Sequence, residues 1–470
     1  MTFSRRGFLA SGLAAGLISG GAMGQGLDQR PPLRPAPDPR DLIARSGLPG
    51  QVGYALTDAR GEALSLGRAA LPVAPASTMK VLTALFALDR LGPSHRFRTR
   101  VIRSGDMLIL AGGGDPVLTT DDLAMLAKQV AGSGMDRPTR FAVWGGALPQ
   151  LPQITDQQAD YLSYNPSVSG MMLNFNRVHL GWRRVGVDYQ LQMEARAARH
   201  SPRAYTVTAA PAAQSDLFSY RHDDDREYWT VSRAALGRNG SRWLPVRLPE
   251  LYAGDVFQTL CRAQGVVLPT PEVIDQLPDG QVVASHDSPT LDVIIRDMLK
   301  YSTNLTAETI GLHASGAPDL AASAEAMRAW LGNIGRGMRL ADHSGLSSDS
   351  LVSAFGMVRV LNGPGRDLNL QPLLKSDPLA ADLGRDATIR HRVAAKTGTL
   401  NFVSNLAGYV TTPDGQQGSF AIFCTDPPRR DASKGQELPA GVSTWTHAAK
   451  SLQRDLIGAF VGRLGGHRVM

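Results

Sequence analysis

The chain has 470 residues, of which 43% are hydrophobic and 19% charged, a composition typical of a globular protein with about two to three domains and a sizeable core. Its formal net charge is +7, but no basic run is interleaved with aromatic residues, so nothing specific indicates nucleic-acid binding. Only Cys261 and Cys424 are present, which excludes a disulfide-stapled scaffold and a cysteine-rich metal site. Because they occur in segments far apart, two buried free thiols are favoured, with a disulfide as the alternative.

The N-terminus has the pattern of an export signal. Ser4-Arg5-Arg6-Gly7-Phe8-Leu9 precedes a moderately apolar run, and Ala22-Met23-Gly24 has the small residues of a cleavage site. This predicts a twin-arginine signal peptide over residues 1–24, a Pro-rich leader over 25–39, and a periplasmic protein that folds before it is exported. The apolar run is shorter than the ~20 residues that span a bilayer. An uncleaved anchor and a disordered leader without an export role are the alternatives.

The first structured elements are two strands and a helix. Gln51–Leu56 alternates as a strand, Asp58–Gly61 supplies a turn, and Ala63–Leu66 returns as a second strand. A mostly apolar helix is predicted to begin at Ser77, after Ala74-Pro75-Ala76. Residues three apart on a helix share a face, so Ser77 and Lys80 are expected to lie within hydrogen-bond reach.

A long insertion follows this helix. About 220 residues separate Lys80 from Ser302, far more than one helical subdomain needs. We therefore predict a mainly β inserted domain over residues 93–287, within a catalytic domain formed by 40–92 and 288–470. Its predicted elements are strands at Phe97–Ile102, Met107–Ala111, Val187–Met193, Ala204–Thr208, Tyr228–Ser232 and Gly280–Ser285, helices at Thr120–Val130 and Leu251–Arg262, and a hairpin turn at Asn239-Gly240.

The C-terminal third returns to the first domain. A helix at Leu291–Leu299 leads into Ser302-Thr303-Asn304. Strands are predicted at Arg392–Lys396, Val403–Val410 and Ser419–Cys424, with a turn at Pro413-Asp414-Gly415 and a final helix at Val442–Leu464. The two N-terminal and three C-terminal strands are expected to form one antiparallel sheet flanked by helices, which is an α+β fold.

The pair Ser77 and Lys80 indicates nucleophilic catalysis. A serine hydroxyl is a poor nucleophile at neutral pH and needs a neighbouring base. Lysine has an ordinary pKa near ~10, so burial and a nearby cation must lower it before Lys80 can accept a proton. Lys396 is the predicted source of that charge.

Two further clusters complete a candidate site. If the link from Ser302 to Asn304 is extended, both side chains face one side, where a hydroxyl and an amide suit a proton relay and a substrate clamp. Thr303 would then face away. Taken alone, each cluster is better explained as a helix cap, a capping link or a strand end, and it is their order and spacing together that indicate acyl transfer.

The cluster Lys396-Thr397-Gly398-Thr399 is predicted to lie at a strand end and to bind an anion. It offers a cation and two hydroxyls to a carboxylate, while Gly398 leaves room for the ligand backbone. The backbone amides of Ser77 and Thr399 are the predicted oxyanion hole.

Other motifs do not support competing chemistry. Asp342-His343-Ser344 contains triad residues, but three consecutive residues cannot form a relay, so we interpret it as a loop. Gly112-Gly113-Gly114 lacks the spacing of a phosphate loop, and no histidine has metal-ligand spacing. We expect neither a metal nor a cofactor.

These motifs resemble those of class C low-molecular-mass penicillin-binding proteins, the D-alanyl-D-alanine carboxypeptidase/endopeptidase family, in which S-x-x-K, S-D-N and K-T-G sets occur. The segments that carry the resemblance are Pro75–Lys80, Gly114–Pro116, Asn174–Arg177, Ser344–Ser347 and Lys396–Leu400. The resemblance covers nearly the whole mature chain and implies a penicillin-binding/serine β-lactamase-like transpeptidase fold. The large insertion resembles the one that distinguishes this class from class A β-lactamases.

The resemblance implies roles for the clustered residues. Ser77 would be acylated with Lys80 as its base, Ser302 and Asn304 would relay protons and clamp substrate, and Lys396, Thr397 and Thr399 would bind a carboxylate. The substrate would be a peptidoglycan stem peptide ending in D-Ala-D-Ala, or a D-alanyl cross-bridge, and β-lactams would be covalent inhibitors.

Two residues depart from the pattern, and two other functions stay open. Thr303 replaces the aspartate of the wider motif, and His343 stands where a glycine is usual. The alternatives are a β-lactamase or esterase with the same serine–lysine core, and a catalytically silent wall-binding protein. A modest basic excess fits weak attraction to an anionic wall polymer or membrane surface, but is common without such a role.

Overall fold

The computed structural model describes residues 36–466. The predicted signal peptide and most of the predicted leader lie outside these residues. The end of that leader already belongs to the fold, because the Asp38 side chain caps helix α1 (Pro39–Ser46) and Pro39 is buried.

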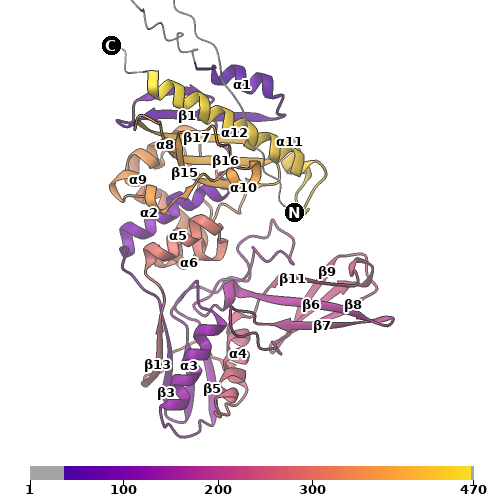
Figure 1. Ribbon diagram of the computed structural model, residues 1–470. Coiled ribbons are helices and arrows are strands. Elements are labelled where there is room, and N and C mark those ends of the chain that lie inside the picture. The colour runs from indigo at the N-terminus through magenta and orange to yellow at the C-terminus, as the bar shows by residue number, and fades with distance from the viewer. Residues whose placement is uncertain (1–35, 467–470) are drawn as a thin grey trace, which may run out of the picture. The chain divides into compact units, whose positions relative to one another are not determined.

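The largest sheet described joins the two ends of the chain (Figure 1). Its neighbours pair antiparallel throughout, with β1 between β17 and β2, and Gln51 opposite Thr425. The order is β14 (Lys375–Ser376), β15 (Arg392–Leu400), β16 (Val403–Thr411), β17 (Gln417–Thr425), β1 (Gln51–Asp58) and β2 (Ala63–Gly67). This confirms the predicted α+β fold.

Both faces of this sheet are covered by helices, which explains why its central strands are continuously apolar. In β17, Phe420 and Ile422 pack on the side of α12, whereas Ala421 and Phe423 pack on the opposite side. The α12 side carries α1, α10 (Ala380–Leu383) and α12 (Val442–Gly465); the other core involves α2 (Lys80–Leu91), α5 (Leu291–Tyr301), α6 (Asn304–Ser315), α7 (Leu320–Trp330) and α8 (Ala354–Asn362). The short helices α9 (Pro364–Asp367) and α11 (Pro427–Ala432) follow α8 and β17 along the chain. Burying each large side chain contributes about 1.5–3 kcal/mol relative to exposure.

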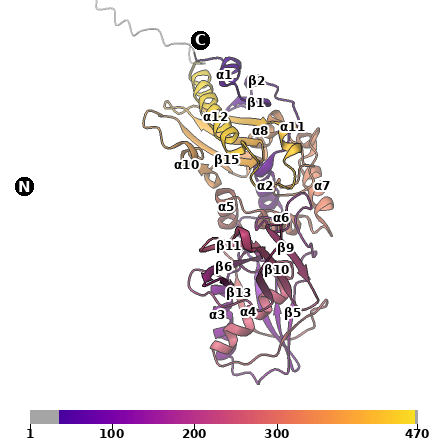
Figure 2. The ribbon, with the colours of Figure 1, turned by 90° about the vertical axis from the view of Figure 1, so that its right-hand side faces the viewer.

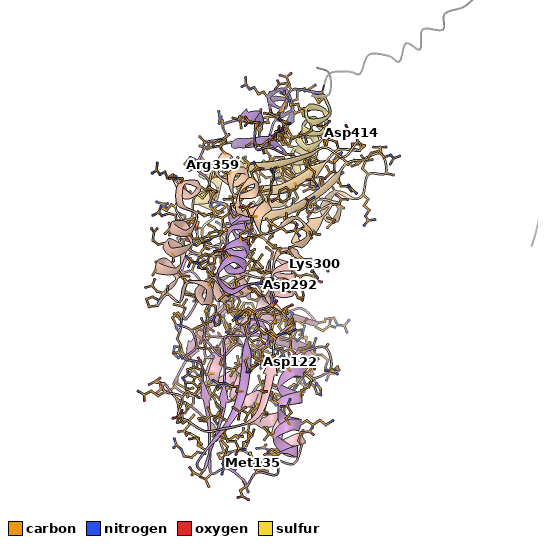
Figure 3. The ribbon with its side chains drawn as sticks, turned by 90° about the vertical axis from the view of Figure 1, so that its left-hand side faces the viewer. Asp122, Met135, Asp292, Lys300, Arg359 and Asp414 are labelled. Atoms are coloured by element: carbon orange, nitrogen blue, oxygen red, sulfur yellow. The ribbon has the colours of Figure 1, made fainter. Side chains whose placement is uncertain are left out.

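Helix α5, which leads into Ser302, shows how one apolar stripe orients a helix. Its buried residues are Leu291, Ile294, Ile295, Met298 and Leu299. These recur at helical spacing, so the helix buries one face. Asp292 and Lys300 lie outside this stripe (Figure 3). The end of α5 is therefore fixed against the core.

Three more sheets in the described range are built from residues 98–287, the range of the predicted insertion (Figure 2). They pack with helices α3 (Thr120–Gly132) and α4 (Pro249–Ala263) around one apolar core. Their strand orders are β12 (Pro271–Val273), β5 (Arg140–Trp144), β4 (Met107–Ala111), β3 (Arg98–Ser104) and β13 (Gln281–Asp287); β11 (Asn239–Pro245), β6 (Arg177–Val185) and β7 (Asp188–Glu194); and β8 (Val207–Ala212), β10 (Glu227–Ser232) and β9 (Phe218–His222).

The predicted hairpin turn at Asn239-Gly240 is wrong. Both residues lie inside β11, which pairs with β6 so that Gly240 faces Trp182. A Cβ atom at Gly240 would lie 2.3 Å from the Trp182 ring, so this glycine makes room for an indole rather than for a turn. The strand predicted at Ala204–Thr208 is also displaced, to Val207–Ala212, where it pairs in parallel with β10.

Candidate active site

Ser77 and Lys80 lie at the junction of two helices. Ala76–Met79 is a 3₁₀ helix and α2 begins at Lys80, so the predicted start of an α-helix at Ser77 is wrong by one turn. The tight turn is closed by the Pro75 carbonyl oxygen, which accepts hydrogen bonds from both the amide and the hydroxyl group of Thr78. Residues three apart eclipse one another in a 3₁₀ helix. The two side chains therefore meet, as predicted.

The Lys80 amine has three hydrogen-bond partners. Its Nζ atom lies 2.9 Å from Ser77 Oγ, 2.8 Å from Asn304 Oδ1 and 2.8 Å from the Ser344 carbonyl oxygen. Asn304 Oδ1 and the Ser344 oxygen can only accept, whereas the Ser77 hydroxyl can donate or accept. A neutral amine has two protons and one lone pair. With its protons on the two obligate acceptors, the lone pair points at the Ser77 hydroxyl.

Burial prepares Lys80 to be that neutral base. The side chain is fully buried, and desolvation lowers the pKa of Lys80 to about 7. The nearby carboxylates of Glu308 and Asp342 oppose this by raising the pKa. Burial and the charge of Lys396 were the predicted causes, and of these two only burial is among the causes found for Lys80. The pKa of Lys396 itself falls well below its usual range, through burial first and then through the charge of Lys80.

The link between α5 and α6 is not extended as predicted. Ser302 ends α5 in the left-handed conformation, with φ 63° and its amide bonded to the Met298 carbonyl oxygen. Thr303 is extended, and Asn304 begins α6, a helix that the sequence patterns did not reveal. Both side chains nevertheless reach the site, since Asn304 contacts Lys80 and Ser302 Oγ lies 3.0 Å from Lys396 Nζ.

Strand β15 brings the third cluster against the 3₁₀ helix. Lys396 is 2% exposed and also donates to the Thr397 carbonyl oxygen at 2.7 Å. The strand continues to Leu400, so the cluster lies within its C-terminal half rather than at its end. A Cβ atom at Gly398 would lie 2.8 Å from the Pro75 oxygen and 3.0 Å from the Ser77 nitrogen. Only glycine allows this close approach of the strand to the nucleophile.

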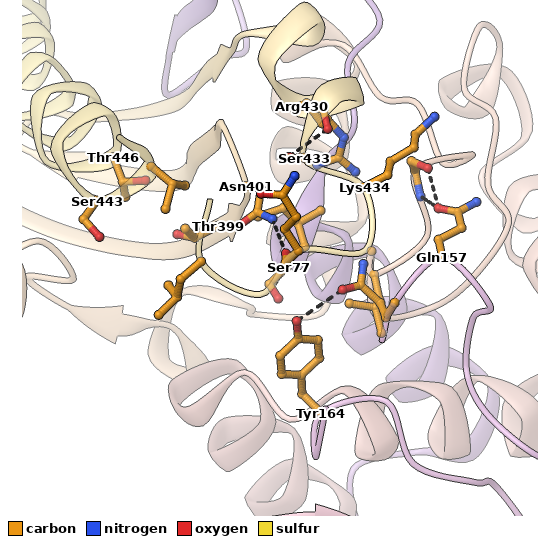
Figure 4. A pocket seen from close by; sticks show the side chains of 18 of the residues that line it. Ser77, Gln157, Tyr164, Thr399, Asn401, Arg430, Ser433, Lys434, Ser443 and Thr446 are labelled. Atoms are coloured by element: carbon orange, nitrogen blue, oxygen red, sulfur yellow. Dashed lines mark hydrogen bonds between the residues drawn. The ribbon is translucent and has the colours of Figure 1, made fainter. Parts of the chain in front are cut away.

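A cavity of about 580 Å³ opens at Ser77 (Figure 4). Ser302, Asn304 and Thr399 also line it, while Lys80 is buried behind them. Lys396, Thr397 and Gly398, predicted to bind substrate, do not line it; Lys396 reaches it only through Ser302.

Residues 157–164 of the predicted insertion close one side of this cavity. The Asn304 side-chain amide donates to the Tyr164 carbonyl oxygen at 2.9 Å, and Gln157 contacts Ser348 and Asp349. Arg430 and residues 433–436 line the opposite side, near α11. No spacing in the sequence indicated these loop residues. Glu308, four residues after Asn304, was detectable in principle, because residues four apart share one face of a helix.

His343 is part of the core rather than a catalytic triad. Its Nε2 atom lies 2.7 Å from Ser323 Oγ, and its ring stacks on Phe86. Burial lowers the pKa of His343 to about 3, so the imidazole is neutral. A Cβ atom at Gly311 would lie 2.3 Å from this ring. His343 thus occupies the space that Gly311 leaves, which gives a steric account of this departure from the family pattern.

Cys261 and Cys424 are both free and buried, as favoured from the sequence. Between residues 36 and 466, no group of three or more His, Cys, Asp or Glu residues could hold a metal ion. In the same range, no helix is long and apolar enough to span a membrane.

The model of the D-Ala-D-Ala carboxypeptidase 3 (S13) family matches residues 44–448. The chain belongs to this S13 family. The chain is 29% identical over 427 residues to the D-alanyl-D-alanine carboxypeptidase of Actinomadura sp. (strain R39), an alignment covering 80% of this chain and 78% of that protein. It is 25% identical over 390 residues to the D-alanyl-D-alanine carboxypeptidase DacB of Haemophilus influenzae, covering 74% and 79%.

Solved structures show the same S13 fold. The crystal structure of penicillin binding protein 4 (dacB) from Haemophilus influenzae superposes with a TM-score of 0.70 at 19% identity, covering 90% of this chain and 99% of the other. A second crystal structure of that protein, complexed with a β-lactam, gives 0.68 at 20% identity and covers 89% and 99%. Family and fold therefore agree with the resemblance stated from the motifs.

Proposed function

We propose that this S13-family enzyme cleaves the D-Ala-D-Ala bond of peptidoglycan stem peptides, or D-alanyl cross-bridges, through an acyl-enzyme on Ser77. The observation that carries the proposal is the contact of Lys80 Nζ with Ser77 Oγ, with two obligate acceptors, Asn304 Oδ1 and the Ser344 oxygen, as its other partners. A nucleophile within hydrogen-bond reach of its base, itself oriented by further groups, is the arrangement that covalent catalysis needs.

Acylation follows from this geometry. Ser77 Oγ attacks the carbonyl carbon of the penultimate residue as its proton passes to Lys80 Nζ. The oxygen that becomes negative is bound by the backbone amides of Ser77 and Thr399, the proposed oxyanion hole. The carbon–nitrogen bond then breaks, and a proton from Lys80 reaches the leaving amine through the Ser302 hydroxyl. Lys80 is neutral again, and Ser77 carries an ester.

Deacylation repeats these steps with water as the nucleophile. Water attacks the ester carbonyl carbon, Lys80 accepts its proton, and the bond to Ser77 Oγ breaks as the serine regains a proton. The products are the shortened peptide acid and free enzyme. The same lysine therefore serves both half-reactions.

The terminal carboxylate is recognised at β15 in this proposal. Thr399, which lines the cavity, provides a hydroxyl donor, and Lys396 lies directly behind Ser302. An arriving carboxylate favours the charged form of this buried lysine. The ring carboxylate of a β-lactam would use the same groups, and one relative of this fold was solved in complex with a β-lactam.

The test is digestion of purified cell-wall fragments with wild type and Ser77→Ala, followed by mass spectrometry. Loss of one D-Ala supports carboxypeptidase activity, split cross-links support endopeptidase activity, and no Ser77-dependent product refutes both. Labelling with a fluorescent penicillin separates the alternatives. A long-lived adduct on Ser77 favours the peptidase, rapid hydrolysis of the drug favours a β-lactamase, and no adduct favours a silent wall-binding protein.

Location is a separate proposal. We infer periplasmic location after export by the twin-arginine route, on the basis of Arg5 and Arg6 and the apolar run that follows. Cell fractionation of the double variant Arg5→Lys, Arg6→Lys tests it. Retention of the variant in the cytoplasm supports the proposal, and unchanged export to the periplasm refutes it.

A further inference from the structure

A fully buried carboxylate lies one helical turn beyond Asn304. Glu308 on α6 is 0% exposed. Its two oxygens accept separate hydrogen bonds from the backbone amides of His343 and Ser344, each 2.9 Å long. Burial raises the pKa of Glu308 to about 8, while its hydrogen bonds to His343 and Ser344 act in the opposite direction and favour the ionised form. Glu308 thus holds two consecutive peptide groups in place, in the loop that precedes α8.

The loop that Glu308 holds carries one of the two obligate acceptors of Lys80. The Ser344 carbonyl oxygen lies 2.8 Å from Lys80 Nζ, and the Ser344 amide is the group bound by Glu308. The other acceptor, Asn304 Oδ1, belongs to the same helix as Glu308. One buried side chain therefore connects both acceptors into a single rigid unit around the amine.

We propose that Glu308 is a positioning residue that holds the Ser344 carbonyl group against Lys80 and so keeps the amine lone pair directed at Ser77. This inference rests on the proposed function. Glu308 touches neither Ser77 nor the cavity, so it acts only through the Ser344 peptide and through its charge. Loss of either contribution changes how readily Lys80 accepts a proton.

The charges around Lys80 come from three further elements besides its own helix. Glu308 belongs to α6, and Lys396 to β15. Asp342 and the neutral His343 belong to the loop that precedes α8. Asp342 bonds within its own loop, to the Ser347 amide and the Ser350 hydroxyl. Of these two carboxylates, only Glu308 accepts hydrogen bonds from a loop while belonging to a helix. Both raise the pKa of Lys80 against the effect of burial.

The experiment is the rate of Ser77 acylation by a fluorescent penicillin, measured from about pH 5 to about pH 10 in wild type and variants. In Glu308→Gln, the side-chain NH2 group faces one of the two backbone N–H groups. Two donors repel one another, so the loop shifts and the Ser344 carbonyl group is displaced. We expect the plateau rate to fall by at least ~10-fold, the scale of a sub-ångström displacement in an active site. The carboxyl group is only partly ionised where Lys80 titrates, and losing this partial negative charge should move the acid midpoint lower.

Two further variants separate positioning from stability. Glu308→Asp keeps the charge but is too short to reach both amides, so it should lower the plateau with the wild-type midpoint. Glu227→Gln is the matched control, because Glu227 is 1% exposed and also accepts bonds from two consecutive backbone amides, those of Arg247 and Leu248, on β10 outside the site. It should lower the melting temperature while leaving both plateau and midpoint unchanged.

A lower plateau and a lower midpoint in Glu308→Gln, with both readouts unchanged in Glu227→Gln, support the proposal. A wild-type plateau in Glu308→Gln overturns it, as does an equal loss of plateau rate in the control. If Glu308→Gln does not fold, a wild-type plateau in Glu308→Asp overturns it and a reduced one supports it. Absence of acylation in the wild type would instead refute the proposed function.

Discussion

Replacing Gly398 by alanine should slow acylation of Ser77 about 10-fold without removing any reactive group. The added Cβ would lie 2.8 Å from the Pro75 carbonyl oxygen, 2.9 Å from the Thr78 nitrogen and 3.0 Å from the Ser77 nitrogen. Ordinary contacts begin at 3.4 Å, and all three neighbours are backbone atoms that cannot rotate away. The strand and the 3₁₀ helix must therefore separate by roughly half an ångström, where a misplacement of ~1 Å costs about 100-fold in rate.

The assay is the second-order rate constant for labelling by a fluorescent penicillin, measured below the melting temperature of each variant. Overpacking of this kind also lowers stability by about 1–3 kcal/mol. The control is Gly181→Ala on β6, where a Cβ atom meets nothing within 4 Å. A Gly398→Ala enzyme that is labelled within about twofold of the wild-type rate would show that the close approach of β15 to Ser77 does not matter.

Three further outcomes are expected. The acylation rate should rise about tenfold per pH unit up to about pH 7 and then level off, since only neutral Lys80 accepts a proton; a flat profile across that range would exclude Lys80 as the base. Gly311→Ala should lower the free energy of unfolding in urea by about 1–3 kcal/mol, and adding His343→Ala should restore most of it; equal losses in the single and double variants would contradict the steric account. A reducing agent should leave the melting temperature unchanged, because Cys261 and Cys424 are free thiols; a clear decrease would indicate a disulfide.

The parts of the fold predicted well are those with one strong local pattern. The apolar runs of β16 and β17 and the helix from Val442 were visible because both sheet faces and one helix face are buried. Helix α6 was missed because every residue from Leu305 to Leu312 is buried, so the helix has no amphipathic period over this stretch. Asn239-Gly240 was misread because the reason for its glycine is a ring on another strand, more than fifty residues away.

The site itself was predictable at the level of residue types but not of geometry. The spacing of Ser77 and Lys80 fixed one contact, since neighbours on a helical turn must meet. The acceptors that orient Lys80 are the side-chain oxygen of Asn304 and the backbone carbonyl oxygen of Ser344. A carbonyl oxygen is present at every residue, so no sequence pattern can single one out. Tertiary packing alone decides which one faces the amine.

The antiparallel pairing of β1 with β17 has a consequence for the order in which the protein forms. Thr57 and Ser419, opposite one another in this pairing, are 362 residues apart. Strand β1 leaves the ribosome long before its neighbour β17, whereas the sheets of residues 98–287 have all their strands before β17 is made. The chain loses conformational entropy when this long loop closes, and it must do so before the contacts between β1 and β17 can stabilise the sheet. Ser77 is thus made well before Asn304 and strand β15, so the site cannot be complete until those later residues have been made.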